Sequence, residues 1–113
     1  MSGARLTRRL ERLEAVRVPD GAGGFDRVWE RRAGLWAEVA VRSGGARVTE
    51  LGVAPRLRLR ITVQDVPPGH AARPAPGDRL REGVRLYEVE AVHEAAPGRL
   101  ACFAQEVTEG GGA

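Results

Sequence analysis

The sequence predicts an all-β protein: a small β-barrel or sandwich of five to six strands with one long loop between two of them. Two observations favour this class. Apolar and polar residues alternate over several short runs, most regularly in LRLRITVQ at positions 57–64. Glycine- and proline-rich stretches typical of turns separate these runs. At 113 residues the chain suits a single domain with its own core.

Composition limits the partners and the compartment. All 18 basic residues are arginine, yet the net charge is only +3. Together with abundant alanine, glycine and proline, this indicates the bias of a GC-rich genome rather than a nucleic-acid surface spanning the protein. The single cysteine, Cys102, cannot form an internal disulfide, which fits a reducing compartment. No apolar run approaches ~18 residues, so we expect neither a membrane span nor a signal peptide.

The first segment allows two interpretations. Leu6, Leu10 and Leu13 fall at helical spacing, whereas LEAVRV, at 13–18, equally fits a strand. Periodicity alone leaves helix and strand open for residues 6–17.

The stretch DGAGG follows Pro19. A phosphate-binding loop of the nucleotide-hydrolase kind needs a lysine, and the chain has none. A dinucleotide-binding fingerprint needs a third glycine where Asp26 stands. We therefore predict a wide turn in which Asp20 accepts amide hydrogen bonds and the glycines adopt left-handed angles. The turn residues are Asp20, Gly21, Gly23 and Gly24.

Two alternating runs follow, one at 25–29 and one at 35–41, and both predict strands. Trp29 and Trp36, one in or beside each run, allow two roles: stacking platforms for bases, or anchors of the barrel core or of a subunit interface. We favour anchoring, and assign Tyr87 and Phe103 to the same core or interface class.

The remaining elements are read in order. Residues 43–55 form a loop with three glycines, and 57–64 form a strand with Leu59, Ile61 and Val63 on one face. Four prolines make 66–78 an irregular connection. The Glu82-Gly83 step predicts a tight hairpin in which Gly83 has positive φ. The apolar phase shifts between positions 86 and 87, which predicts a bulge or a strand twist there. A turn at 96–98 and a last strand at 99–107 complete the chain.

Candidates for chemistry are few. His70, His93 and Cys102 lack the short paired spacings of zinc ligands, and no nucleophile, acid and base stand in a known pattern. We predict no catalytic residue, no metal site, no cofactor and no enzyme, with Cys102 as a small core residue and His70 solvated. Arginines at 47, 56, 58 and 60 form either an exposed polar face or a basic loop beside a polyanion.

Several segments carry a resemblance to a known family. In order they are VRVPDGAGGFDRVW, LWAEVAVRSG, LRITV, DRLREGVRLYEVEAVHE and GRLACFAQEV. Over residues 8–107 the chain resembles the head-tail joining family of tailed bacteriophages, the head-completion or stopper proteins of siphophage necks, which also occur in gene transfer agents. The resemblance implies a β-barrel domain at 9–107, with a strand over 9–18, after a flexible segment at 1–8 and before a disordered tail at 108–113.

The resemblance also implies a function and its partners. The protein would form a homo-oligomeric ring, expected to be a hexamer, between the portal-bound adaptor and the tail terminator. It would lie in the neck of a virion or phage-like particle assembled in the bacterial cytoplasm, without catalysis and without a membrane. The loop at 43–55 would close the DNA channel, with Arg47 and Arg56 facing packaged double-stranded DNA. The gating residues would be Ser43, Gly44, Gly45, Ala46, Arg47, Val48, Thr49, Glu50, Leu51 and Gly52.

Two departures from the family pattern leave alternatives open. No acidic residue directly follows the Ser-Gly step in SGGARVTE, and the 66–78 connection is longer than the usual link. Either loop, 43–55 or 66–78, could face the lumen. A monomeric β-barrel that binds nucleic acid is the alternative function, although it needs aromatics among the basic residues and LRLRITVQ has none.

Overall fold

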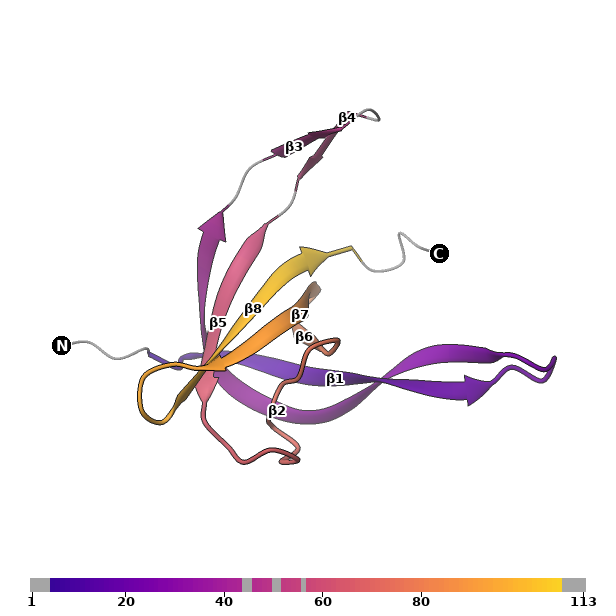
Figure 1. Ribbon diagram of the computed structural model, residues 1–113, viewed down its shortest axis with the longest axis horizontal. Helices are drawn as coiled ribbons and strands as arrows, with labels where there is room; N and C mark the ends of the chain where they lie inside the picture. Colours follow the sequence, from indigo (N-terminus) through magenta and orange to yellow (C-terminus); the bar gives the residue numbers. More distant parts are fainter. Residues whose placement is uncertain (1–4, 44–45, 50–51, 56, 109–113) are drawn as a thin grey trace.

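Eight β-strands and no helix make up the described part of the chain, which in this computed structural model comprises residues 5–43, 46–49, 52–55 and 57–108 (Figure 1). The strands are β1 (Arg8–Pro19), β2 (Phe25–Ser43), β3 (Ala46–Thr49), β4 (Gly52–Pro55), β5 (Arg58–Gln64), β6 (Arg79–Glu82), β7 (Arg85–Glu94) and β8 (Arg99–Val107).

Six of these strands close into an antiparallel barrel in the order β1-β2-β5-β8-β7-β6. The barrel closes because β6, the last strand in this order, pairs with β1, the first, through residues 79–81. Strands β3 and β4 form a separate two-stranded sheet within the predicted long loop. The predicted all-β barrel is confirmed, and the long loop is itself partly a hairpin.

The first segment is a strand, as the family resemblance implies and as periodicity alone could not decide. Its helix-like spacing has a simple cause: Leu10 and Leu13 lie on opposite faces of β1, and both are buried. Two buried residues three positions apart are typical of a helical turn, but they also occur in a strand when one of them is buried on each face.

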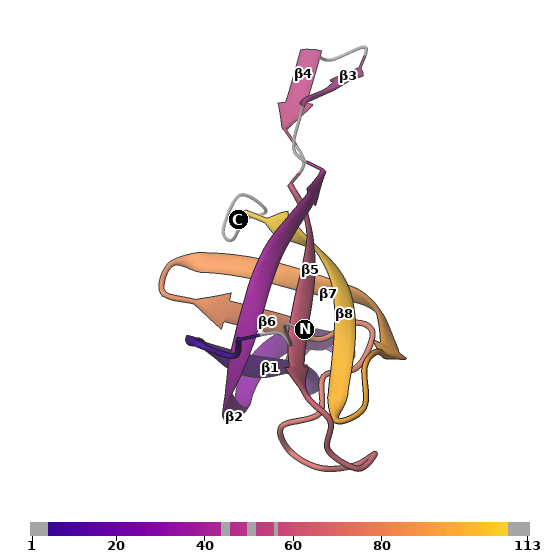
Figure 2. The ribbon, with the colours of Figure 1, turned by 90° about the vertical axis from the view of Figure 1, so that its left-hand side faces the viewer.

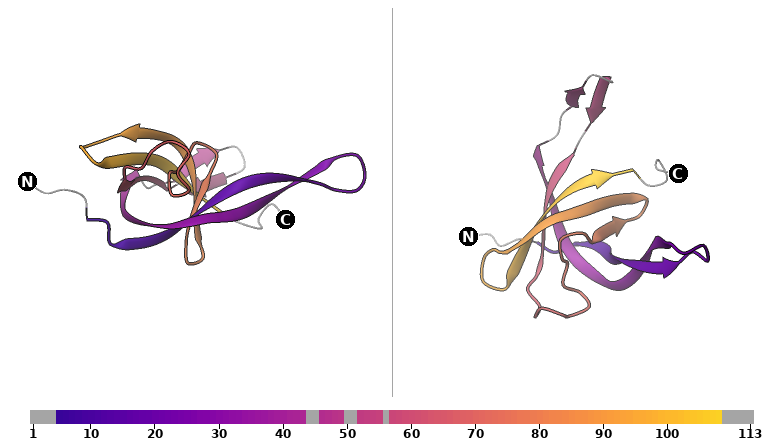
Figure 3. Two further views of the ribbon diagram at one scale, coloured as in Figure 1. Left: turned by 90° about the horizontal axis from the view of Figure 1, so that it is seen from below. Right: turned by 45° about the vertical axis from the view of Figure 1, so that its right-hand side comes forward.

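The two strands expected between residues 25 and 41 are one continuous strand of 19 residues, β2. A register shift separates the pairs Arg12–Ala33 and Leu13–Arg31, so Arg32 is an extra residue at a bulge between the two alternating runs. Beyond this bulge, residues 14–19 of β1 pair only with β2, and neither β6 nor β5 extends along them. Residues 14–32 therefore form a two-stranded projection, called the arm below (Figures 1 and 3).

The core is the barrel interior, and the alternation at 57–64 contributes to it as predicted. Leu59, Ile61 and Val63 are each at most 2% exposed. Burying a side chain of this size stabilises the fold by about 1.5–3 kcal/mol. The whole cluster comprises Leu10, Leu35, Ala37, Leu59, Ile61, Val63, Leu80, Tyr87, Val89, Leu100, Cys102 and Ala104.

The β6–β7 hairpin matches its prediction, with Gly83 at φ 61°. The bulge expected between positions 86 and 87 is instead between Val89 and Ala91, where Glu90 is the extra residue. The expected position was wrong because Leu86 and Tyr87 are both buried although they lie on opposite faces of β7. The apolar phase shift there reflects burial on two sides rather than a bulge.

Candidate assembly surfaces

The tip of the arm is the DGAGG turn, and its backbone is held by one carboxylate. Asp20 Oδ1 accepts hydrogen bonds from the amides of Ala22 (2.7 Å) and Gly24 (3.0 Å). These bonds favour the ionised carboxylate and hold the pKa of Asp20 below its usual value. Gly21 and Gly23 have positive φ, as predicted. Gly24 does not: it is needed for space, because a Cβ there would lie 2.8 Å from Asp20 Oδ2.

The two faces of the arm differ in chemistry. Paired residues share a face, so Arg17 and Arg27 lie beside Phe25 and Trp29 on one side of the ribbon. The Arg17 guanidinium lies 4.2 Å from the centroid of the Phe25 ring, and that of Arg27 lies 5.1 Å from the Trp29 centroid. We call these four residues the basic face of the arm. The opposite face carries Val16, Val18, Asp26, Val28 and Glu30.

Ion pairs connect neighbouring strands, and the pairs of Glu11 with Arg31 and Arg81 lie where the arm meets the barrel. Glu11 accepts hydrogen bonds from both Arg31 and Arg81, which lower its pKa. Glu82 accepts from Arg8 and from the Tyr87 hydroxyl, and its hydrogen bond to Arg8 is the main cause of its lowered pKa. Further pairs are Arg32–Glu14 and Arg85–Glu106.

One ion pair is buried. Arg12 Nε donates to Asp78 Oδ2 at 2.7 Å, and the two side chains are 11% and 8% exposed. Arg12 also donates to the carbonyl of Ala71 at 2.9 Å, and the amide of Ala75 donates to Asp78 at 2.9 Å. This cluster fixes the irregular 66–78 connection against β1. No pattern in the sequence joins positions 12 and 78.

The predicted gating segment extends the β2–β5 pair away from the barrel (Figure 2). Ser43 pairs with Arg58, and beyond it β3 pairs with β4 from Ala46–Pro55 to Thr49–Gly52. The segment is therefore a projecting hairpin rather than an open loop. Gly44, Gly45, Glu50, Leu51 and Arg56 lie outside the described residues, and the structure does not describe the side chain of Arg47.

The aromatic residues predicted to anchor the core or an interface differ in their burial. Tyr87 is fully buried in the core, and Phe103 is half-buried on the outer face beneath the Arg42 guanidinium, 4.6 Å from its ring centroid. Core anchoring is wrong for Trp36, which is 52% exposed because its neighbours Leu35 and Ala37 take the inward positions. Trp36 instead lines a pocket of about 320 Å³ with Leu6, Gly34, Leu35, Val63, Gln64, Val66, His70 and Ala72.

Residues with catalytic or metal-binding chemistry do not gather within the described part of the chain, where no group of three or more His, Cys, Asp or Glu is placed to hold a metal ion. His70 and His93 are exposed on different elements. Cys102 is fully buried in the core, and burial raises its pKa to about 12. No helix among the described residues is long and apolar enough to cross a membrane.

Sequence reasoning missed the arm and the buried Arg12–Asp78 pair. Alternation around Phe25 and Trp29 indicated a strand but not its separation from the barrel, since pairing partners are not written in a local pattern. The even spacing of Arg27 and Trp29 does predict one shared face, and that signal was present at 25–29.

The described part of the chain is thus a small closed barrel with two projecting hairpins. The comparisons with known proteins show the family to which it belongs. The model of the phage head completion protein family matches residues 1–107, so the chain belongs to this family of structural virion proteins. No curated protein matches the chain.

A solved structure supports the same assignment. The chain is similar to a chain of a structure described as the virion of a native gene transfer agent (GTA) particle, with 42% sequence identity and a TM-score of 0.80. The match covers 94% of this chain and 99% of that chain. At this coverage the likeness extends over nearly the whole of both chains.

Proposed function

We propose that the chain is a head-tail connector of the stopper type, which forms a ring, expected to be a hexamer, between the portal-bound adaptor and the tail terminator of a phage or gene transfer agent particle. The family and the likeness to a chain of a gene transfer agent virion support a structural role in the particle. The observation that carries the finer proposal is the β3–β4 hairpin, which extends beyond the barrel on the β2–β5 pair.

The hairpin has dimensions suited to closing a channel. Residues 43–55 folded back on themselves reach roughly 20 Å, because an extended residue spans about 3.4 Å and half of the segment runs outward. Several copies that converge on a ring axis would block a passage wide enough for duplex DNA. Arg47 and Arg56 would then retain DNA through contacts with phosphate, which weaken as salt rises.

The proposal includes no reaction and no cofactor. The alternative, a monomeric nucleic-acid-binding barrel, gains one observation: Phe103 is in register with Arg60 on the outer face of β8 and β5. Arg42 lies over that ring, and a single covered aromatic does not make a stacking track for several bases. The connector is therefore the better-supported function.

The test begins with the mass of the purified protein, alone and after mixing with tail-less, DNA-filled heads. Addition in about six copies, with recovery of tail joining, is the expected result. Replacing 44–55 with a short glycine linker should leave a folded barrel that still adds to heads but lets DNA escape. Arg47→Gln, which keeps the hairpin length, is the matched control and should increase leakage only at low salt, where the phosphate contact of the wild type is strongest. Normal DNA retention by the shortened variant would show that the hairpin does not close the channel. A monomeric protein that binds single-stranded DNA and does not bind heads would favour the alternative function.

A further inference from the structure

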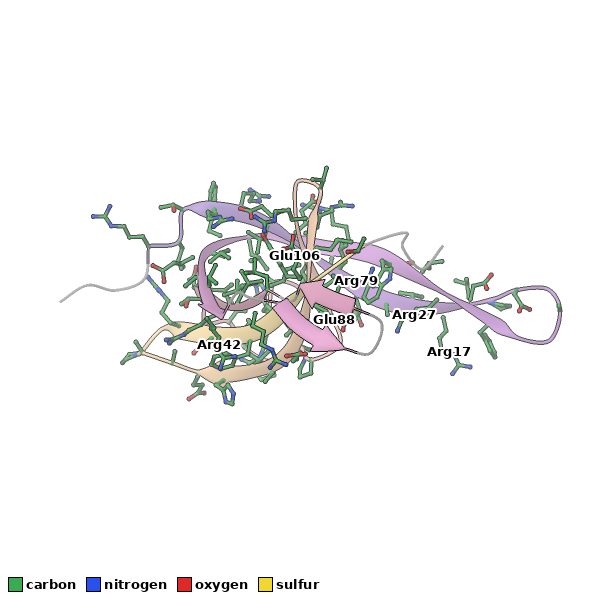
Figure 4. The ribbon with its side chains drawn as sticks, turned by 90° about the horizontal axis from the view of Figure 1, so that it is seen from above. Arg17, Arg27, Arg42, Arg79, Glu88 and Glu106 are labelled. Carbon is green, nitrogen blue, oxygen red and sulfur yellow. The ribbon has the colours of Figure 1, made fainter. Side chains whose placement is uncertain are left out.

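The basic face of the arm carries charges that no described residue of the chain neutralises. Within the described residues, Arg17 and Arg27 make no ion pair and no side-chain hydrogen bond, whereas Arg31 and Arg32 on the same strand bind Glu11 and Glu14. Arg79 stacks on Trp29 at 4.3 Å, and its Nε is buried without a partner in the described structure. Figure 4 shows Arg79, Arg27 and Arg17 following one another from the base of the arm outward.

Guanidinium groups stacked on aromatic rings are prepared for an anionic partner. The ring occupies one face of the guanidinium and restricts its motion, while the N–H donors around its edge stay available to an acceptor. Phe25 is 57% exposed beside them, and Val28 on the opposite face is 38% exposed. Arginine and aromatic residues together are the composition of protein interface hot spots.

The charge of the whole arm selects a protein over DNA as that partner. Residues 14–32 contain four arginines and four carboxylates, so the arm is electrically neutral. A neutral projection would release few counterions from a duplex and would bind it weakly. A protein partner can instead place carboxylates beside the two arginines on one face of the arm, away from the acidic residues on its opposite face.

Carboxylates of this kind lie on β7. Glu90 and Glu94 are exposed and make no ion pair with any described residue, and the only arginine of the strand, Arg85, is paired with Glu106. Strand β6 pairs with β7 only over Arg85–Glu88, so no strand covers that edge at Glu90–Glu94. Strand β7 packs against β6 and β8 and contacts neither β1 nor β2, so the arm of the same chain does not reach it.

We propose that the basic face of the arm binds Glu90 and Glu94 of a second copy of this chain. Two different surfaces of one chain that complement each other give a head-to-tail contact, and such contacts form a ring when the rotation from one subunit to the next closes. The inference rests on the proposed ring and specifies how its neighbouring subunits are held together. Arg17 and Arg27 pair with the carboxylates of the next subunit, and Phe25 becomes covered in the contact.

Charge reversal on both sides tests this contact. Arg17→Glu/Arg27→Glu and, separately, Glu90→Arg/Glu94→Arg should each reduce self-association and the number of copies added to heads by at least about tenfold. The fourfold variant restores opposite charges at every head-to-tail contact and should recover assembly. Arg5→Glu/Arg60→Glu changes the net charge as much as the arm variant at exposed positions outside both surfaces, and should assemble normally.

The outcomes separate this inference from the proposed function. Wild-type protein that joins heads in several copies, together with an arm variant that joins equally well, overturns the contact and leaves the connector intact. Wild-type protein that neither joins heads nor self-associates in sedimentation at high concentration overturns both. Loss of DNA binding by the arm variant, without recovery in the fourfold variant, assigns the arm to nucleic acid instead. If the reversals unfold the protein, Arg27→Cys/Glu90→Cys replaces them: oxidation should give covalent multimers, and monomers only would reject the contact.

Discussion

Removing the buried carboxylate of Asp78 should destabilise the protein more than any exposed ion-pair substitution. Asp78→Ala leaves the Arg12 guanidinium, 11% exposed, with the Ala71 carbonyl and the more distant Glu14 carboxylate as its remaining acceptors. Breaking a buried pair from one side costs about 3–5 kcal/mol because the other charge stays buried. The variant also leaves the Ala75 amide without its acceptor, which adds about 1 kcal/mol.

Urea unfolding followed by circular dichroism measures the loss, which should appear as a lower midpoint with an unchanged m-value. Asp65→Ala is the matched control, because Asp65 is 39% exposed and lies 3.6 Å from Arg73. It should change the free energy of unfolding by less than about 0.5 kcal/mol. Arg12→Leu/Asp78→Leu should recover part of the loss, since no charge is then left buried. A loss below about 1 kcal/mol for Asp78→Ala would show that the cluster does not hold the connection to the barrel.

Three further predictions concern the barrel and the arm. Tyr87→Phe removes the hydroxyl that donates to Glu82, 2.9 Å away, and should lower the free energy of unfolding, measured in urea, by about 1–2 kcal/mol. An unchanged free energy of unfolding would contradict a stabilising role for this hydrogen bond. The folded state lowers the pKa values of four carboxyl groups, those of Glu11, Asp20, Glu82 and Glu106. These carboxylates therefore contribute stability that is present at neutral pH and is lost as the pH falls below about 4.5. A free energy of unfolding that stays constant from pH 7 to pH 3 would contradict this. Cys102, with its pKa raised to about 12 by burial, should react with a thiol reagent only as fast as the protein unfolds, and rapid labelling of folded protein would refute its place in the core.

Local signals in the sequence predicted the features that depend on neighbouring residues. Alternation at 57–64 identified the buried face of β5, and the Glu82-Gly83 step identified a turn whose glycine has positive φ. The hydrogen bonds of Asp20 follow from the same kind of reasoning, because an aspartate before glycines accepts amides two and four residues on. Each of these structures is decided within a few residues of chain.

Features that depend on tertiary pairing were not predictable in the same way. Trp36 is exposed because its side of β2 faces away from the barrel interior. The residue type alone, a large apolar side chain, does not predict this exposure. The Arg12–Asp78 pair joins positions 66 residues apart in the chain. Only the resemblance to the phage family decided for a strand over residues 9–18, which the structure places at Arg8–Pro19, because a strand buried on two sides has apolar residues at the same spacing as a helix.

The continuity of β2 relates the two projections to each other. One uninterrupted strand, Phe25–Ser43, runs from the tip of the arm through the barrel to the base of the β3–β4 hairpin. At about 3.3 Å per residue such a strand spans roughly 60 Å along its curved path. Its only shift in register against β1 is at Arg32, where the arm leaves the barrel. If the arm holds the neighbouring subunit, the same backbone therefore sets where each hairpin stands relative to that neighbour, and the geometry of the ring contact determines whether the hairpins meet at the axis.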